Sequence, residues 1–455
     1  MMASHSLSME AQRSWAGEIG WRSLDLGLRG LQALVVAPTA LFLMALTAML
    51  LRHPDVAFYE IDRVAFGVLL VAVVARAAVK RQRLLIVERA TWPMLGLTLL
   101  AMASVIGQPF DHETWSLLAA KFVVPFCLFH VGALVFREEG SLRRFEFFSL
   151  LVLAYLCFTA IAFLLNAKFL IFPRFILDES LGYHVDRARG PLLQAVANGV
   201  SLNLLGILAL HAYLRGRIRG IKAPLLLGAL PVAILATMTR AVWLSFAVSV
   251  GILIVRSGNR KLRRISAAVA LIGMVALLVT LTVDDRRHAI SDRLQDSGPV
   301  EFRRAVYAGS WEMFLEKPFV GWGINRMPTE LARHVSGYRH RELYPHNTYL
   351  ELLVEHGIAG LALYLWLMWE IWRLGRGRIP PMERGGFLNR QFHSMWPVLM
   401  GVYLVNASLV VMNYQFVNGF LFTLAGMLAA QHRRARQCVA CGVAAPCRAC
   451  ERCVQ

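Results

Sequence analysis

The amino-acid sequence predicts an all-α polytopic membrane protein with about twelve transmembrane helices, and three observations support this fold class. Hydrophobic residues make up 57% of the 455 residues and charged residues only 17%, with a mean hydropathy of +0.52. Apolar runs of membrane-spanning length recur along the chain, and basic segments fall on every second connection between them. A soluble globule with a solvated surface cannot be built from this composition.

The apolar runs give the order of the expected spans. Each run approaches the roughly 20 residues that cross a hydrocarbon core, and Gly or Pro within a run is tolerated where neighbouring helices satisfy the backbone. The expected spans cover residues 31–51, 64–79, 92–107, 117–136, 147–166, 191–214, 223–238, 241–256, 265–283, 357–374, 392–412 and 414–430.

Orientation follows from the basic connections, because Lys and Arg accumulate on the cytoplasmic side of short loops. The basic segments are 80–83, 137–144, 215–222, 256–264, 373–384 and 433–436. Both termini are then expected to be cytoplasmic, and the other connections face the periplasm or its equivalent. Most of the formal charge of +19 is explained by these loops beside anionic headgroups, so no nucleic acid partner is expected.

The spans divide the chain into five parts. The expected parts are a cytoplasmic N-terminal segment 1–30, nine spans over 31–283, a large periplasmic loop 284–356, three spans over 357–430 and a cytoplasmic Cys-rich tail 431–455. The tail contains Cys438, Cys441, Cys447, Cys450 and Cys453. Reduced thiols at this spacing make a candidate zinc site, but a dispensable cysteine-rich tail is the favoured interpretation, because the spacing between the pairs is short for a zinc ribbon.

The large loop is expected to contain two helices and the reactive chemistry. Apolar residues recur at helical spacing over 303–315, and Pro318 ends that pattern. A second helix is expected to begin at Pro345, with His346 and Asn347 in its first turn. A helix N-terminus disfavours protonation of an imidazole, so His346 is expected to be neutral and able to act as a base or bind phosphate. A capping or structural histidine is the alternative.

Arginines in separate connections form the second part of the expected site. The predicted topology places them all on the side of His346; they are Arg187, Arg189, Arg240, Arg303 and Arg304. Guanidinium groups match phosphate oxygens in bidentate geometry, so a set of them beside apolar helices suits a membrane-embedded diphosphate. Ion pairing with nearby Asp and Glu, or simple solvation, is the alternative for each one.

Two stretches carry a family resemblance. RRAVYAGSWEMFLEKPFVGWG and PHNTYLELLVEHGIAG resemble the O-antigen ligase and polymerase superfamily, whose large loop has an Arg, an aromatic residue, Pro with G-x-G, H-N and E-x-G-x-x-G. These features fall on Arg303, Tyr307, Pro318, Gly321, Gly323, His346, Asn347, Glu355, Gly357 and Gly360. Tyr307 stands where the family often has Trp. The segments around Arg189, Gly190 and Asn198 and around Arg240 are similar to upstream family motifs.

The resemblance implies a GT-C type membrane glycosyltransferase that moves a glycan from undecaprenyl diphosphate to an acceptor, without metal, nucleotide or other cofactor. It implies that Arg189, Arg240 and Arg303 hold the diphosphate and that His346 activates the acceptor hydroxyl. Arg187 and Arg304 are second choices for the diphosphate. The supporting motif residues are Asn347, Gly321, Gly323 and Glu355. Inversion at the anomeric carbon is then expected.

Three activities share these motifs: ligation of O-antigen to lipid A-core, polymerisation of O-units, and transfer to protein hydroxyls. We favour the ligase in the bacterial inner membrane, because the large loop is single and late and no soluble domain is expected after the last span. A twelve-helix transporter is the alternative outside this class. It predicts repeated halves and charges near the bilayer midplane, which the sequence does not show.

Overall fold

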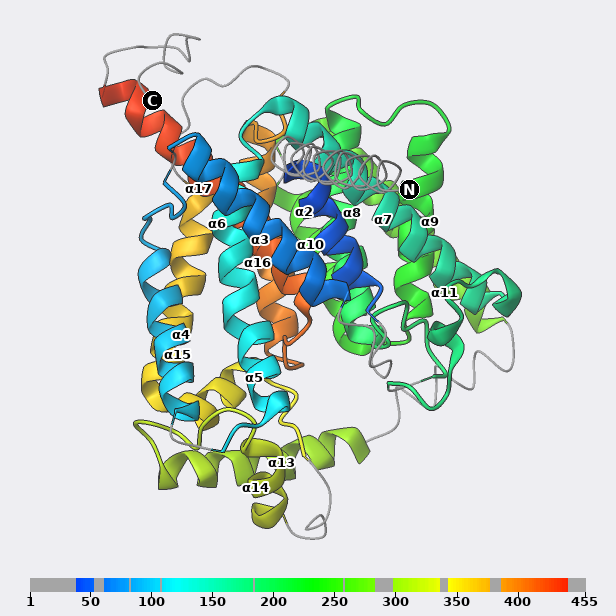
Figure 1. Ribbon diagram of the computed structural model, residues 1–455. Coiled ribbons are helices and arrows are strands. Elements are labelled where there is room, and N and C mark those ends of the chain that lie inside the picture. The colour runs from blue at the N-terminus through cyan, green and yellow to red at the C-terminus, as the bar shows by residue number, and fades with distance from the viewer. Residues whose placement is uncertain are drawn as a thin grey trace, which may run out of the picture.

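The computed structural model contains helices and no strands in its described residues, which confirms the all-α class (Figure 1). The structure describes residues 38–52, 61–81, 83–106, 109–182, 185–256, 258–282, 298–335, 343–376 and 386–440. The expected N-terminal segment lies outside these ranges. So does the Cys-rich tail after α17, and the side chain of Cys438 within α17 is not described either.

The helices follow the order of the predicted spans. They are α2 (Pro38–Leu50), α3 (Ile61–Val79), α4 (Thr91–Val105), α5 (His112–Leu118), the π-helix η1 (Ala119–Val123), α6 (Val124–Val135), α7 (Glu139–Leu164), the short 3-10 turns η2 (Lys168–Leu170) and η3 (Arg174–Leu177), α8 (Ala195–Leu214), α9 (Lys222–Ala236), α10 (Arg240–Arg256), α11 (Arg260–Leu281), α13 (Gly298–Glu316), α14 (Met327–His334), α15 (Thr348–Leu374), α16 (Arg390–Ala407) and α17 (Gln415–Ala440).

Each predicted apolar run overlaps one helix of this set, with α5, η1 and α6 forming one continuous rod. Among the residues that the structure describes, five helices are long and apolar enough, by length and composition, to cross a membrane. They are His112–Val135, Glu139–Leu164, Ala195–Leu214, Arg260–Leu281 and Thr348–Leu374. The other described helices are shorter or less apolar, so a multi-pass membrane protein is supported and a count of twelve crossings stays a prediction.

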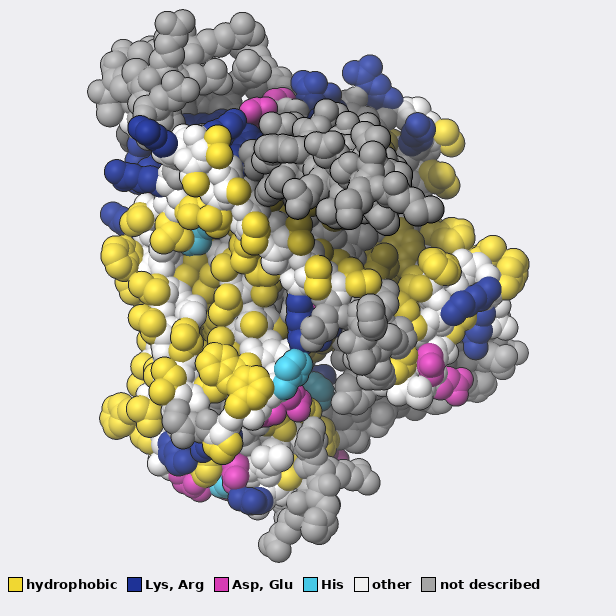
Figure 2. Space-filling model, in the orientation of Figure 1, with side chains coloured by type: hydrophobic (Ala, Val, Ile, Leu, Met, Phe, Trp, Pro, Cys, Tyr) yellow, Lys and Arg dark blue, Asp and Glu magenta, His cyan; other side chains and the backbone are white. Residues whose placement is uncertain are grey.

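The bundle has inner and outer helices. The apolar window of α8 is 100% buried, whereas that of α11 is only 11% buried. Leu271, Met274 and Leu278 of α11 are more than half exposed, and in Figure 2 hydrophobic side chains cover the middle of the molecule. Apolar residues on an outer surface are stable there when hydrocarbon is the solvent, so this surface is suited to face lipid.

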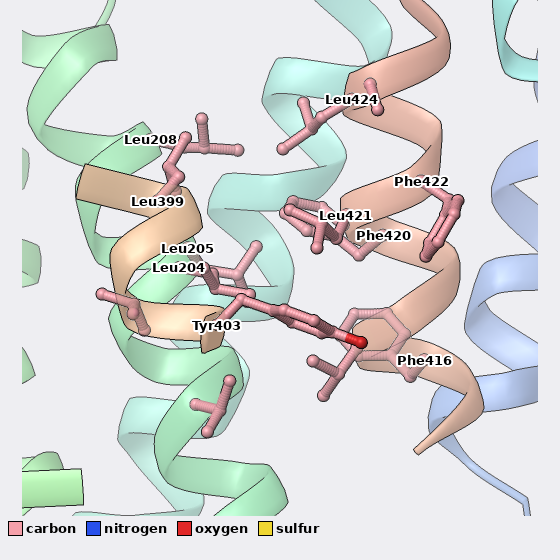
Figure 3. Packing of buried hydrophobic residues seen from close by; sticks show 14 of the residues in the cluster. Leu204, Leu205, Leu208, Leu399, Tyr403, Phe416, Phe420, Leu421, Phe422 and Leu424 are labelled. Carbon is pink, nitrogen blue, oxygen red and sulfur yellow. The ribbon is translucent and has the colours of Figure 1, made fainter. Parts of the chain in front are cut away.

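The core lies between α6, α8, α16 and α17. Figure 3 shows leucines of α8 and α16, such as Leu205 and Leu399, packed toward the aromatic side chains of α17, such as Phe420. Each of these three residues is 1% exposed or less. The hydroxyl of Tyr403 in this core donates to the side-chain oxygen of Asn418 at 2.9 Å, which satisfies a buried polar group.

Several of the basic connections gather at one end of the bundle. Arg434 donates to the carbonyl of Arg137 at 2.6 Å, and Arg215 pairs with Glu139 at 3.2 Å. The same Glu139 accepts from the backbone of Phe387 at 3.4 Å, and Figure 2 shows Lys and Arg at the upper end. Segments that the positive-inside pattern placed together therefore lie together, while the side of the membrane that they face stays a prediction.

The opposite end carries the large loop, whose described part has a small core of its own. α13 runs across the foot of the bundle with α14 beside it (Figure 1). Val306, Met313 and Leu331 are fully buried there, together with Val354 of α15. The side chain of Tyr307 packs on the same cluster. The loop is thus built onto the first two turns of α15.

Helix α15 is broken at Gly357, and the break receives the loop. The backbone of Gly357 has φ 64° and ψ −166°, a conformation that favours glycine because it has no Cβ. A Cβ here would overlap the carbonyl of Phe319. The predicted start of the tenth span, at residue 357, coincides with this break, and the helical turns before it belong to the loop.

Backbone hydrogen bonds from the loop satisfy groups that the break leaves unpaired. The bonds run from Trp322 N to Val354 O at 2.9 Å, from Gly323 N to Glu355 O at 2.9 Å, and from Ile358 N to Pro318 O at 2.8 Å. Gly321, with φ +69°, lies so close to the backbone of Glu355 that a Cβ would overlap it. Gly321 and Gly357 therefore form one interlocked joint.

We expect Gly321→Ala to open this joint. Alanine at positive φ costs about 1–2 kcal/mol, and the overlap with the Glu355 backbone adds to that cost. The apparent melting temperature of the purified protein in detergent should fall by several degrees, corresponding to about 2 kcal/mol or more. Gly401→Ala in α16 is the matched control, because nothing lies within 4 Å of its Cβ position. Equal melting of the two variants would contradict this account of the joint.

Candidate functional site

His346 lies just before α15, not within its first turn. The prediction that this helix begins at Pro345 is wrong: it begins at Thr348, and Asn347 is the N-cap. The side-chain oxygen of Asn347 accepts from the backbone of Tyr349 at 3.0 Å and of Leu350 at 3.2 Å. Asn is among the best N-caps because its short carbonyl reaches these unpaired amides. His346 precedes the cap in a left-handed conformation with φ 48°.

The charge of Arg303 acts on His346. The imidazole is exposed at the surface on one side, while the protein on its other side removes water and lowers the pKa of His346 below the ordinary 6.5. The nearby guanidinium of Arg303 lowers this pKa further, because it disfavours a second positive charge. A neutral imidazole is therefore the resting form at neutral pH, as required for a proton acceptor.

Arg303 and Arg304 occupy the second turn of α13, since that helix begins at Gly298 rather than at the arginines. Arg303 is half-buried and Arg304 is exposed. Adjacent helical residues point in different directions, so only one of the two can share the environment of His346. That arginine is Arg303, because its charge contributes to the lowered pKa of His346.

Arg189 is buried and directed toward the backbone of its own loop. Its Nε donates to the carbonyl of Ile176 at 2.9 Å, and its two terminal nitrogens donate to the carbonyls of Leu181 and Asp178. The side chain is only 2% exposed. The guanidinium therefore holds the η3 segment in place, and its expected contact with a diphosphate is not prepared in this conformation. Neighbouring Arg187 pairs with Asp186 at 3.8 Å.

The Arg189 segment is tied to the chain that leads to Arg240. The side-chain amide of Asn198 donates to the carbonyl of Ala188 at 2.9 Å, and the backbone of Ala188 donates to Ala236 at 3.1 Å. Arg240 itself is exposed at the first residue of α10. The expected site residues therefore fall into two groups. Arg189 is connected to the segment before Arg240, and Arg303 acts on His346. That these two groups form a single site stays a prediction.

Sequence reasoning missed a buried ion triad beside this site. Lys121 of η1 donates to Glu351 at 2.7 Å and to Glu355 at 3.0 and 3.1 Å. Each of the three side chains is less than a tenth exposed. Glu355 was expected only as a supporting motif residue. A lysine in an apolar run and two carboxylates four residues apart were the available signals, because an intramembrane charge needs a partner.

Metal ligands are not gathered in the part of the chain that the structure describes. Within those ranges no group of three His, Cys, Asp or Glu side chains is placed to hold a metal ion. The zinc hypothesis for the Cys-rich tail concerns residues outside them, apart from Cys438. The two cysteines whose side chains are described, Cys127 and Cys157, lie unpaired within apolar helices.

Comparison with known proteins identifies one family. Residues 224–365 match the family model described as O-antigen ligase. No curated protein matches the chain. The matched segment runs from α9 into α15 and contains Arg240, Arg303 and His346, so the resemblance to the O-antigen ligase superfamily is confirmed over these residues. Arg187 and Arg189 precede the matched segment.

Arg189→Lys is expected to destabilise the protein. A lysine ammonium cannot reproduce the planar arrangement of donors that serves three carbonyls, and each lost hydrogen bond to a charged group costs about 1.5–3 kcal/mol. Thermal unfolding in detergent should show a clear loss, whereas Arg187→Lys, which only weakens a partly exposed pair, should stay within about 1 kcal/mol of wild type. Wild-type melting of Arg189→Lys would show that the guanidinium is not a structural element.

Proposed function

We propose that this membrane protein, whose central segment matches the O-antigen ligase family, transfers O-antigen polysaccharide from undecaprenyl diphosphate to lipid A-core at the periplasmic face of the bacterial inner membrane. One observation carries the proposal: His346 and Arg303, both within the matched segment, lie at the loop-bearing end of an apolar bundle, where burial and the charge of Arg303 keep the pKa of His346 below its ordinary value. This pair offers a base and a phosphate-binding cation at the place where a lipid-linked sugar would arrive.

The proposed reaction is a single displacement at the anomeric carbon. The acceptor hydroxyl oxygen attacks this carbon while its proton passes to the imidazole of His346. The bond between the anomeric carbon and the phosphate oxygen breaks, and both electrons leave with undecaprenyl diphosphate. Attack opposite to the leaving group inverts the configuration. A guanidinium stabilises the charge that develops on the diphosphate.

Arg240 and Arg303 are proposed as the donor-binding arginines. Arg240 opens α10, where unpaired amides and the helix dipole favour an anion. Arg303 lies next to the base and would face the same phosphates. Arg187 and Arg304 remain second choices. Arg189 is assigned a different role, because its guanidinium already orders the loop that approaches Arg240.

The membrane arrangement is proposed from the charge pattern. Both termini and the basic end would lie in the cytoplasm, and α13 and α14 in the periplasm. The twelve overlapping helices would then each cross the membrane once, as expected for a GT-C type transferase, with membrane lipids around them. The domain limits inferred from the sequence belong to the same proposal.

The direct test supplies the purified protein in lipid nanodiscs with undecaprenyl-diphosphate glycan and one acceptor at a time. Lipid A-core, a second glycan carrier and an acceptor protein are offered separately. Glycosylated lipid A-core supports the ligase, while a longer lipid-linked glycan or a glycosylated protein would replace it by polymerase or protein transferase activity. Uptake of the glycan lipid without transfer would favour a transporter and overturn the proposal.

His346→Ala should reduce transfer at least about 100-fold, because the displacement loses its proton acceptor. The melting temperature should stay near that of wild type, since the side chain is exposed and precedes the helix cap. The matched control is His334→Ala in α14, a histidine of the same loop whose ring contacts Glu316 at 2.9 Å. Transfer by His346→Ala at the wild-type rate would remove the base from the mechanism.

The pH profile provides a separate prediction. Because the pKa of His346 is lowered, the imidazole stays neutral, and the enzyme active, to a lower pH than an ordinary histidine would allow. Arg303→Gln removes the nearby cation, so this pKa should rise and the acidic limb of kcat/KM should move to higher pH. Arg304→Gln, one residue along α13, should leave the limb in place. A shift to lower pH in Arg303→Gln would contradict the electrostatic pairing.

A further inference from the structure

A buried lysine in the fourth predicted span forms ion pairs with the first turns of α15, next to the large loop. Lys121 contacts Glu351 at 2.7 Å and Glu355 at 3.0 Å. The two carboxylates are four residues apart on α15 and share one face of it. Without the ammonium group between them they would repel each other in an environment that excludes water, so Lys121 determines how this face of α15 meets η1.

The local sequence explains how Lys121 reaches both carboxylates. Pro125 has no backbone N–H, and its ring would crowd the carbonyl four residues earlier, which is that of Lys121. The rod widens there into the five-residue π-helix η1. A π-helical turn changes the direction of the side chains that it carries, and such turns are frequent at functional sites.

The two carboxylates lie on a short helical unit that is bounded by a helix cap at one end and by a backbone break at the other. This unit, Thr348–His356, begins after His346 and its Asn347 cap and ends at the Gly357 break. The break removes the stiffness that a continuous helix would give. The direction in which His346 projects therefore depends on contacts made by the unit itself.

Those contacts come from three sides. The hydroxyl of Thr348 donates to the carbonyl of Val410 at 2.9 Å and accepts from the backbone of Met412 at 2.9 Å. The loop at the break bonds Val354 and Glu355. On the remaining side, Lys121, Thr348 and Glu351 line a cavity shared with Tyr364, Tyr403 and Asn418. Apolar packing is incomplete at a cavity, so the charged bonds from Lys121 to Glu351 and Glu355 are the strongest contacts on this side.

We propose that Lys121 is a positioning residue: its bonds to Glu351 and Glu355 fix the orientation of the Thr348–His356 unit and so hold His346 beside Arg303. This proposal rests on the transferase function proposed above. Lys121 does not touch the substrate. Its removal should therefore impair the rate of the chemical step more than donor binding, because an error of about 1 Å in the position of a reacting group costs about 100-fold in rate.

The first experiment compares two buried ion pairs. Lys121→Met should lower kcat about 100-fold and leave the donor KM within about twofold of wild type. The matched control is Arg215→Met, which breaks a pair of similar burial with Glu146 at 2.7 Å at the opposite, basic end. It should lower thermal stability with little change in kcat. Equal kcat losses in the two variants would overturn the proposal, because the effect would then be general loss of stability.

Rescue variants keep the proposal testable where Lys121→Met folds poorly. Lys121→Arg keeps the charge and should retain most of the activity. The exchange variant Lys121→Glu with Glu351→Lys restores one cation between two carboxylates and should regain at least about tenfold over Lys121→Glu alone. An exchange variant that melts like wild type and shows no recovery would overturn the positioning role.

A structural measurement separates this proposal from the proposed function. Spin labels at Glu301 of α13 and Tyr344, both exposed, would be placed in a variant lacking the native cysteines. The distance distribution should be narrow with Lys121 present, broader in Lys121→Met and unchanged in Arg215→Met. This result would support the positioning role even if wild-type protein transferred no glycan, which would contradict only the function. An unchanged distribution in Lys121→Met would refute the positioning role.

Discussion

The structure depends on one requirement: where a helix is interrupted away from water, the backbone groups freed at the break must find hydrogen-bond partners elsewhere in the protein. α15 is interrupted at Gly357, and the segment Pro318–Gly323 supplies the missing partners. Unsatisfied amides cost several kcal/mol each where water is excluded, so the loop cannot leave the break without a large loss. These hydrogen bonds attach the long loop to the helical bundle.

This constraint explains why His346 can be placed accurately although it precedes a helix. A continuous α15 would transmit every tilt of the membrane-spanning part to His346. The break separates the Thr348–His356 unit from that part, and side-chain contacts with other helices then set its position. Thr348 binds the turn after α16, and Lys121 binds from η1. Contacts from distant parts of the chain thus converge on nine residues.

Much of the fold could be read from the sequence, because its determinants are local. Apolar runs predicted the helices, and the alternation of basic connections predicted which helix ends lie together. The triad could not be read in this way, since Lys121 and Glu351 are 230 residues apart in sequence. A lysine in an apolar run indicates that a partner is needed but does not identify which residue it is. The partners of Arg189 were hidden for another reason: they are backbone carbonyls, which every residue carries. The position of His346 was misread because Pro345 and Asn347 both favour helix starts, and the side-chain cap of Asn347 prevailed.

The charges around His346 also fit the kind of reaction proposed. A histidine that faces a carboxylate becomes a stronger base, whereas His346 faces the cation of Arg303 and is a weaker one. A weak base is sufficient if the leaving group departs readily, because the acceptor hydroxyl becomes more acidic as its bond to the sugar forms. Diphosphate is such a leaving group when guanidinium ions neutralise it. The same cation can therefore lower the basicity of His346 and promote departure of the diphosphate. The weaker proton acceptance by His346 is then offset by the easier departure of the leaving group.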